Sequence, residues 1–234
     1  MKSMKRLSLR FSGLLVMAGL LVSTAHAQYF LRGDFNGWGM TPLTDNGNGT
    51  FSATVTGGTP GANVEFKIAN ADWSSAYPGS NVRTVYDASG NLTVNFTPSP
   101  AVDGWSPTGA RVGYNDPQQF GWDLMGSLNG WTTPIVSLTS LGNGHYGAEF
   151  VIPTPGTYYF KFREAGNWNI SVGGDFGNSA GDIPFTTTDS FFDVWTELSL
   201  DNGSWEIIPV PEPSVLALLA TGGTMLLIRR RKQA

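Results

Sequence analysis

The segment Leu31-Arg32-Gly33-Asp34-Phe35-Asn36-Gly37-Trp38 is the most informative part of the sequence, because a close copy returns later as Leu124-Met125-Gly126-Ser127-Leu128-Asn129-Gly130-Trp131. The copies stay in step: Asn48-Gly49-Thr50-Phe51 matches Asn143-Gly144-His145-Tyr146, Phe66-Lys67-Ile68 matches Phe160-Lys161-Phe162, and Trp73 matches Trp168. The offset stays near about 94 residues, which indicates an internal repeat of two structural units.

Short alternating runs inside each copy predict β-strands. In Val64-Glu65-Phe66-Lys67-Ile68 and Tyr158-Tyr159-Phe160-Lys161-Phe162, apolar residues recur with the period of two that puts one face of a strand in the core. Asn46-Gly47-Asn48-Gly49 and Gly142-Asn143-Gly144 are typical of hairpin turns, because Asn and Gly tolerate positive φ. We therefore predict an all-β fold class, with two tandem immunoglobulin-like β-sandwiches over 28–115 and 119–209.

The start of the chain is predicted to be a signal peptide, residues 1–27. A positively charged segment is followed by an apolar run over 11–22, which is too short to span the roughly 30 Å core of a bilayer. The run leads to Ala25-His26-Ala27, a small-x-small pattern. Signal peptidase is therefore expected to cut after Ala27.

The end of the chain, 210–234, has a three-part layout. Pro211-Glu212-Pro213 precedes an apolar stretch, 215–228, and then the basic cluster Arg229-Arg230-Arg231-Lys232. This layout resembles the PEP-CTERM sorting signal of Gram-negative bacteria. The resemblance implies a transmembrane helix that anchors the precursor transiently in the inner membrane, and cleavage near Pro211-Glu212-Pro213 by an exosortase-type membrane protease. The alternative is a plain membrane anchor, and in both cases the body lies outside the cytoplasm, at the cell surface or in the extracellular matrix.

The body between these segments is acidic and has no cysteine. Only six of the 14 Lys and Arg lie between Gln28 and Val210, against seventeen of the 18 Asp and Glu. This charge balance excludes the basic footprint of a nucleic-acid-binding protein. Without disulfides, the exported body has to be held together by its apolar core.

Each copy contains the same trio of two Trp and one Lys: Trp38, Lys67 and Trp73, then Trp131, Lys161 and Trp168. Strand alternation points both Lys side chains away from the core, and each Trp follows a turn-like stretch. Flat rings at loops beside an outward Lys suit the mixed apolar and polar surface of a sugar. Packing in the core or at its rim is the alternative for these Trp, and it is the role that we assign to Trp105, Trp122, Trp195 and Trp205.

The pattern Gly-x-Phe-Asn-x-Trp, Phe-Lys-Ile/Phe and a later Trp resembles the starch- and glycogen-binding modules, including that of AMP-activated kinase β subunits. Arg163-Glu164-Ala165-Gly166-Asn167-Trp168 with Val172-Gly173-Gly174-Asp175 is also similar to starch-binding outer-surface lipoproteins of Bacteroidetes. The resemblance implies that Trp38, Lys67 and Trp73 contact α-glucan, with Asn91 in the fourth family position. It implies the same for Trp131, Lys161 and Trp168, although the later loop of that copy, Thr188-Asp189-Ser190, offers no clear Asn.

Enzyme chemistry finds little support in the sequence. With no Cys, and only His145 left after processing, thiol catalysis and His-cluster metal sites are excluded. We therefore expect no enzyme activity, no cofactor and no metal. The favoured function is non-catalytic carbohydrate binding, with α-glucan as the preferred polysaccharide. A structural matrix or biofilm protein, whose sandwiches act as spacers or self-associate, is the alternative, and a glycosidase with two facing carboxylates is a third.

Overall fold

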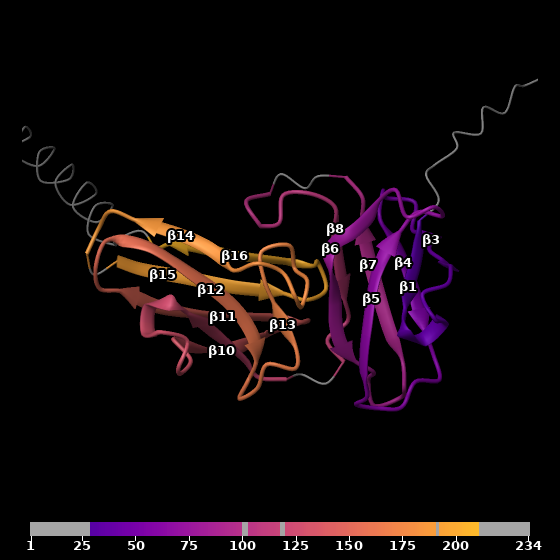
Figure 1. Cartoon of the computed structure of the whole chain (residues 1–234), viewed down its shortest axis with the longest axis horizontal. Helices are drawn as coiled ribbons and strands as arrows, with labels where there is room; N and C mark the ends of the chain where they lie inside the picture. The colour runs from indigo at the N-terminus through magenta and orange to yellow at the C-terminus, as the bar shows by residue number, and fades with distance from the viewer. Residues whose placement is uncertain (1–28, 100–102, 118–119, 191, 211–234) are drawn as a thin grey trace, which may run out of the picture.

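The computed structural model describes residues 29–99, 103–117, 120–190 and 192–210, and these residues form an all-β protein (Figure 1). The all-β prediction is confirmed. The only helices among the described residues are two short 3-10 turns, η1 (Asp34–Asn36) and η2 (Ser127–Asn129), at matching places in the two copies. None of the described helices has the length and apolar character that crossing a membrane requires.

The first copy folds into two four-stranded antiparallel sheets, ordered β2-β1-β5-β6 and β3-β4-β7-β8. Their strands are β1 (Phe30–Gly33), β2 (Thr41–Pro42), β3 (Thr44–Asp45), β4 (Phe51–Val55), β5 (Asn63–Ala69), β6 (Ala76–Val85), β7 (Leu92–Thr97) and β8 (Arg111–Tyr114). The sheets pack face to face, since Phe66 of β5 contacts Tyr114 of β8 with ring centroids 6.1 Å apart, and Tyr77 of β6 contacts Phe96 of β7 at 5.6 Å. We call this unit the N-terminal half.

The second copy, the C-terminal half, forms one eight-stranded sheet that runs β13-β12-β9-β10-β11-β15-β16, with β14 also paired to β12. Its strands are β9 (Trp122–Gly126), β10 (Val136–Gly142), β11 (His145–Ile152), β12 (Gly156–Glu164), β13 (Ser171–Val172), β14 (Ile183–Thr187), β15 (Phe192–Ser199) and β16 (Ser204–Pro209). Strand β10 pairs with β9 through its first part and with β11 through its second. In the N-terminal half two separate short strands take these roles, because β2 pairs with β1 and β3 pairs with β4.

Strand alternation follows the sequence pattern. Phe66 and Ile68 are buried on β5, as are Phe160 and Phe162 on β12, while Lys67 and Lys161 between them are only half-buried. The hairpin predicted at Gly142-Asn143-Gly144 joins β10 to β11, and all three residues have positive φ, with Asn143 at 53°. The period of two in these runs therefore predicts the core correctly.

The two halves contact each other along a continuous interface, visible in Figure 1 where β6 and β8 face β13. One set of contacts comes from the segment after Trp168: Arg83 Nη1 donates to the Asn169 carbonyl at 3.2 Å, the Ser80 N–H donates to Asp175 Oδ2 at 2.8 Å, and the Asn178 N–H donates to the Asn81 carbonyl at 2.7 Å. A second set comes from the turn between β15 and β16, where the Leu200 carbonyl accepts from the Tyr114 N–H at 2.8 Å. The ring of Phe176 packs against Tyr114 with centroids 6.4 Å apart. The halves are thus joined by specific hydrogen bonds as well as by the chain.

Candidate functional site

A tight loop after β1 places Trp38. The side chain of Asn36 accepts a hydrogen bond from the Gly33 N–H at 3.1 Å and donates to the Leu31 carbonyl at 3.2 Å, which folds the loop back onto the strand. The Trp38 N–H then donates to the Gly33 carbonyl at 2.9 Å. Trp38 adopts a left-handed φ of 64°, which is unusual for a bulky residue and is maintained by these bonds.

The loop after β9 repeats the backbone geometry around Trp131, although Asn129 donates to Thr133 instead of bridging back to the strand as Asn36 does. The Trp131 N–H donates to the Gly126 carbonyl at 2.9 Å, and φ at Trp131 is again 64°. Glycine is needed where the loop begins, because a Cβ on Gly126 would lie 2.6 Å from both the Phe160 ring and the Tyr159 carbonyl oxygen. The repeated motif therefore encodes one loop that turns a Trp out of the sheet.

A second loop in each half brings a second Trp beside the first. Trp73 follows β5, where its N–H lies 3.5 Å from the Asn70 carbonyl, and its φ is 64°. Trp168 follows β12, where the Asn167 side chain accepts from the Asn169 N–H at 2.8 Å. Three of the four site Trp are thus held in a left-handed conformation, a form of backbone strain that tends to occur at functional sites.

The structure brings the predicted Trp residues together in pairs. The ring centroids of Trp38 and Trp73 are 6.5 Å apart with 41° between the planes, and those of Trp131 and Trp168 are 6.2 Å apart with 47° between the planes. Trp73 is 43% exposed and Trp168 is 44% exposed, while their partners are half-buried. Each half therefore displays a pair of tilted indole rings at its surface.

Arg32, which sequence reasoning missed, holds the first pair in place. Its guanidinium carbon lies 4.3 Å from the centroid of the Trp73 ring. Nη1 donates to the Trp38 carbonyl at 3.2 Å, and Nη2 donates to the carbonyls of Asn70 and Ala71 at 2.8 Å each. Arg32 is 4% exposed, so one buried guanidinium ties both Trp loops together and covers one face of the Trp73 ring. The signal available in the sequence was a cation beside the repeated motif.

The second pair has an Arg beneath it as well, but from another strand. The guanidinium carbon of Arg163, on β12, lies 5.0 Å from the centroid of the Trp168 ring. Its Nη2 lies 3.4 Å from Asp123 Oδ2, which also accepts from the Gly166 N–H at 3.2 Å. The position that corresponds to Arg32 is Met125. The two halves therefore support their exposed Trp through different residues.

Lys67 lies directly across from Arg32 in the pairing of β1 and β5, so both project from the same face. Its Nζ donates to the Gly79 carbonyl at 2.7 Å. Burial lowers the pKa of the Lys67 ammonium, and the negative charge of Asp175 in the C-terminal half acts in the opposite direction. Lys67 is thus close to the Trp pair and also close to the interface between the halves.

Lys161 occupies the matching place on β12, across from Met125. Tyr159, two residues earlier and therefore on the same face, is 47% exposed. The N-terminal half has Glu65 at this position, paired with Arg83. The C-terminal half consequently shows a third exposed aromatic ring on the face of its Trp pair.

Asn91 is not brought to the first pair. Its N–H donates to Asp87 Oδ1 at 2.8 Å in the turn after β6. Because β6 pairs with β5 so that Val85 lies opposite Asn63, this turn is at the end of β5 far from Ala69 and the Trp73 loop. The predicted sorting and cleavage residues, Ala27, Pro211, Glu212, Pro213, Arg229, Arg230 and Arg231, lie outside the described residues.

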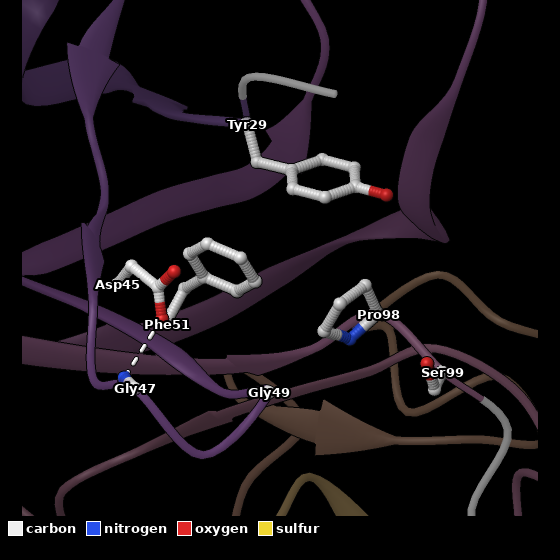
Figure 2. A pocket seen from close by; sticks show the side chains of 7 residues that line it. All are labelled: Tyr29, Asp45, Gly47, Gly49, Phe51, Pro98 and Ser99. Atoms are coloured by element: carbon white, nitrogen blue, oxygen red, sulfur yellow. Dashed lines mark hydrogen bonds between the residues drawn. The ribbon is translucent and has the colours of Figure 1, made fainter. Parts of the chain in front are cut away.

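Both Trp pairs are exposed platforms, distinct from the hollow shown in Figure 2. That hollow, of about 430 Å³, lies between Tyr29, the β3–β4 hairpin and the residues after β7. Its rings are those of Tyr29 and Phe51, and its Asp45 carboxylate is engaged by the Gly47 N–H at 2.8 Å. None of the predicted sugar-binding residues lines it.

No protein-family model matches the chain, and no curated protein matches it. Among solved structures, a pullulanase from Bacillus acidopullulyticus is similar over 80% of this chain, with 14% sequence identity and a TM-score of 0.29. The match covers 29% of the pullulanase chain, so this chain spans less than a third of its length. A likeness this distant carries no argument about function.

Proposed function

We propose that this protein is an exported, non-catalytic carbohydrate-binding protein, with α-glucan as its favoured ligand. The observation that carries the proposal is the repeated pair of surface Trp rings, 6.5 Å and 6.2 Å apart, each with an exposed ring placed over an Arg. Indole rings offer broad apolar faces to the C–H groups of a pyranose, and nearby cations can bond its hydroxyls.

The tilt between the rings supports the choice of α-glucan. Planes inclined by 41° and 47° turn the two ring faces in different directions instead of forming one flat shelf. A chain whose successive sugar units turn relative to one another can stack one unit on each ring. A flat, extended chain matches coplanar rings better.

We also propose how the chain is organised, how it is processed and where it acts. The two halves act as immunoglobulin-like binding modules over 28–115 and 119–209, between a signal peptide and a PEP-CTERM-like tail. Signal peptidase and an exosortase-type protease process the chain, and the body remains at the surface or in the matrix of a Gram-negative bacterium. The repeated trio and the three-part tail support this setting.

A structural matrix protein is the second candidate, because the hydrogen bonds between the halves favour a rigid spacer. Affinity electrophoresis through gels that contain amylose or glycogen separates the two functions. The wild-type protein should be retarded, the double variants W38A/W73A and W131A/W168A should each be retarded less, and thermal melts should stay close to wild type. If no α-glucan retards the wild-type protein, the carbohydrate proposal is wrong and the structural one gains.

A further inference from the structure

The outer face of β11, β15 and β16 in the C-terminal half is a second surface that combines an aromatic ring with charged groups, and it is built from strands that carry none of the paired Trp. Residues directly opposite one another in antiparallel strands share a face. One row of this face is Glu149, Trp195 and Ile208, and the next is Gly147, Glu197 and Glu206. The opposite face of the same strands carries the buried residues Phe150, Val194 and Leu198.

Trp195 lies flat on this outer face. A methyl group added at Gly147 would lie 2.5 Å from Cζ2 of the indole and 3.1 Å from Cδ1 of Leu141, so the ring occupies space that only glycine leaves open. Leu141, Val151 and Ile208 border the face and are each 40% to 50% exposed. The result is an apolar platform with a flat ring near its centre, and that ring also packs against its own sheet, as expected for Trp195.

Carboxylates line one side of the platform. All four acidic residues of the three strands, Glu149, Asp193, Glu197 and Glu206, are on the outer face, and β11, β15 and β16 contain no Lys or Arg. Glu197 Oε2 accepts from the Trp195 indole N–H at 3.3 Å, and Glu197 Oε1 lies 2.9 Å from Nδ1 of His145. Glu206 sits directly across from Glu197, and like charges in this position are unfavourable.

The pKa of Glu206 shifts in the direction expected for two facing carboxylates. Burial, followed by the negative charge of Glu197, raises the pKa of Glu206, while a hydrogen bond with Trp195 acts in the opposite direction. A bound positive charge would relieve this repulsion, and an indole face beside it would add a cation–π attraction. A second copy of this chain does not fit, because the same acidic face would meet itself.

We propose that this face binds a polysaccharide that carries free amino groups, with a protonated amino-pyranose over Trp195 and its ammonium group between Glu197 and Glu206. The sugar ring stacks on the indole, and its C–H groups contact the aliphatic border. The ammonium group places a positive charge beside Glu206 and adds to the contact that Glu197 already makes with His145. This site is separate from the α-glucan platforms and does not depend on them.

The test is isothermal titration calorimetry of the full-length protein at low salt with a chitosan hexamer, and with the fully N-acetylated hexamer as matched control. The amino hexamer should bind about tenfold more tightly than the acetylated one, because acetylation removes the charge but keeps the ring. W195A, which leaves the net charge unchanged, should weaken the amino hexamer about tenfold. W38A/W73A should leave its affinity unchanged, and W195A should leave glycogen retention unchanged.

E206Q covers the case in which W195A fails to fold. It should melt at a higher temperature than wild type at neutral pH, since it removes the repulsion, and yet bind the amino hexamer more weakly. Equal affinity for both hexamers would overturn the proposal, because the amino groups would then not be recognised. Unchanged affinity in both variants would also overturn it and leave only diffuse attraction to an acidic protein. Hexalysine that binds more tightly than the amino hexamer, and depends on Trp195, would also overturn it in favour of a basic peptide.

Discussion

The guanidinium of Arg32 lies 4.3 Å from the ring centroid of Trp73 and also bonds the carbonyl of Trp38, so one buried cation determines how both rings of the first pair are placed. The loops that it joins are far apart in sequence, since Nη2 reaches Asn70 and Ala71. The ring arrangement should therefore depend on Arg32 as much as on the Trp residues.

Replacing Arg32 with Met, the residue at the matching position of the C-terminal half, tests this dependence. R32M keeps a long apolar side chain but removes the hydrogen bonds to three backbone carbonyls, so the unfolding free energy should fall by about 3 kcal/mol. Retention on glycogen should fall through the loss of the first site. Urea denaturation and affinity electrophoresis measure the two effects. R163M is the matched change in the other half, and identical affinity of R32M and wild type would refute the positioning role.

Exposed and buried Trp should differ sharply in their contribution to stability. W122A removes a ring that is 1% exposed and should lower the unfolding free energy by about 3 to 5 kcal/mol. W73A removes a ring that is 43% exposed and should lower it by about 1 kcal/mol. Denaturant unfolding followed by circular dichroism compares the variants. A loss in W73A as large as that in W122A would mean that Trp73 is a core residue.

Asp175 should couple the two halves. Its carboxylate accepts from the Ser80 N–H and the Gly177 N–H at 2.8 Å each, so D175A should weaken the interface by about 1 to 2 kcal/mol. D175N keeps one acceptor oxygen and is the milder control. We expect D175A to broaden the thermal transition or split it in two, as measured by differential scanning calorimetry. A transition as sharp as that of wild type would argue against this coupling.

Glu65 should make stability depend on pH. Burial raises the pKa of its carboxyl, but hydrogen bonds from Asn81 and Arg83 and the charge of Arg83 outweigh burial, so the pKa lies below the usual 4.5. A depressed pKa in the folded state stabilises the protein above pH 4.5, and this stabilisation is lost as the pH falls through the folded-state pKa. Wild type should thus be more stable than E65Q at pH 7, with the difference shrinking toward acid pH in thermal melts. A pH-independent difference would contradict the linkage.

The C-terminal tail should be absent from the mature protein. Cleavage near Pro211-Glu212-Pro213 would leave no peptide beyond Val215 in the extracellular form, as mass spectrometry of the native material can show. Replacing Arg229, Arg230 and Arg231 with Gln should impair sorting, because we propose that this basic cluster keeps the C-terminus on the cytoplasmic side. An extracellular form that extends to Ala234 would favour a permanent anchor.

Local sequence patterns are sufficient to predict the strands, the repeat and the matching loops that carry the four site Trp. Period-two runs such as Phe66-Lys67-Ile68 depend only on near neighbours, so they predict which side chains face the core. The recurrence of Gly33 and Trp38 as Gly126 and Trp131 predicts that the same loop is built twice, because the backbone bond between them is local.

Contacts between side chains that are distant in sequence follow from the three-dimensional fold and could not be predicted from these patterns. The contacts of Arg32 with Asn70, of Asp175 with Ser80 and of Trp195 with the space over Gly147 all depend on how strands pair and how the halves pack. The position of Asn91 also depends on strand pairing, because the register of β5 and β6 places it away from the Trp pair. A side chain's own neighbours in sequence determine the face it occupies, whereas its partners across that face depend on register and packing, which no local pattern contains.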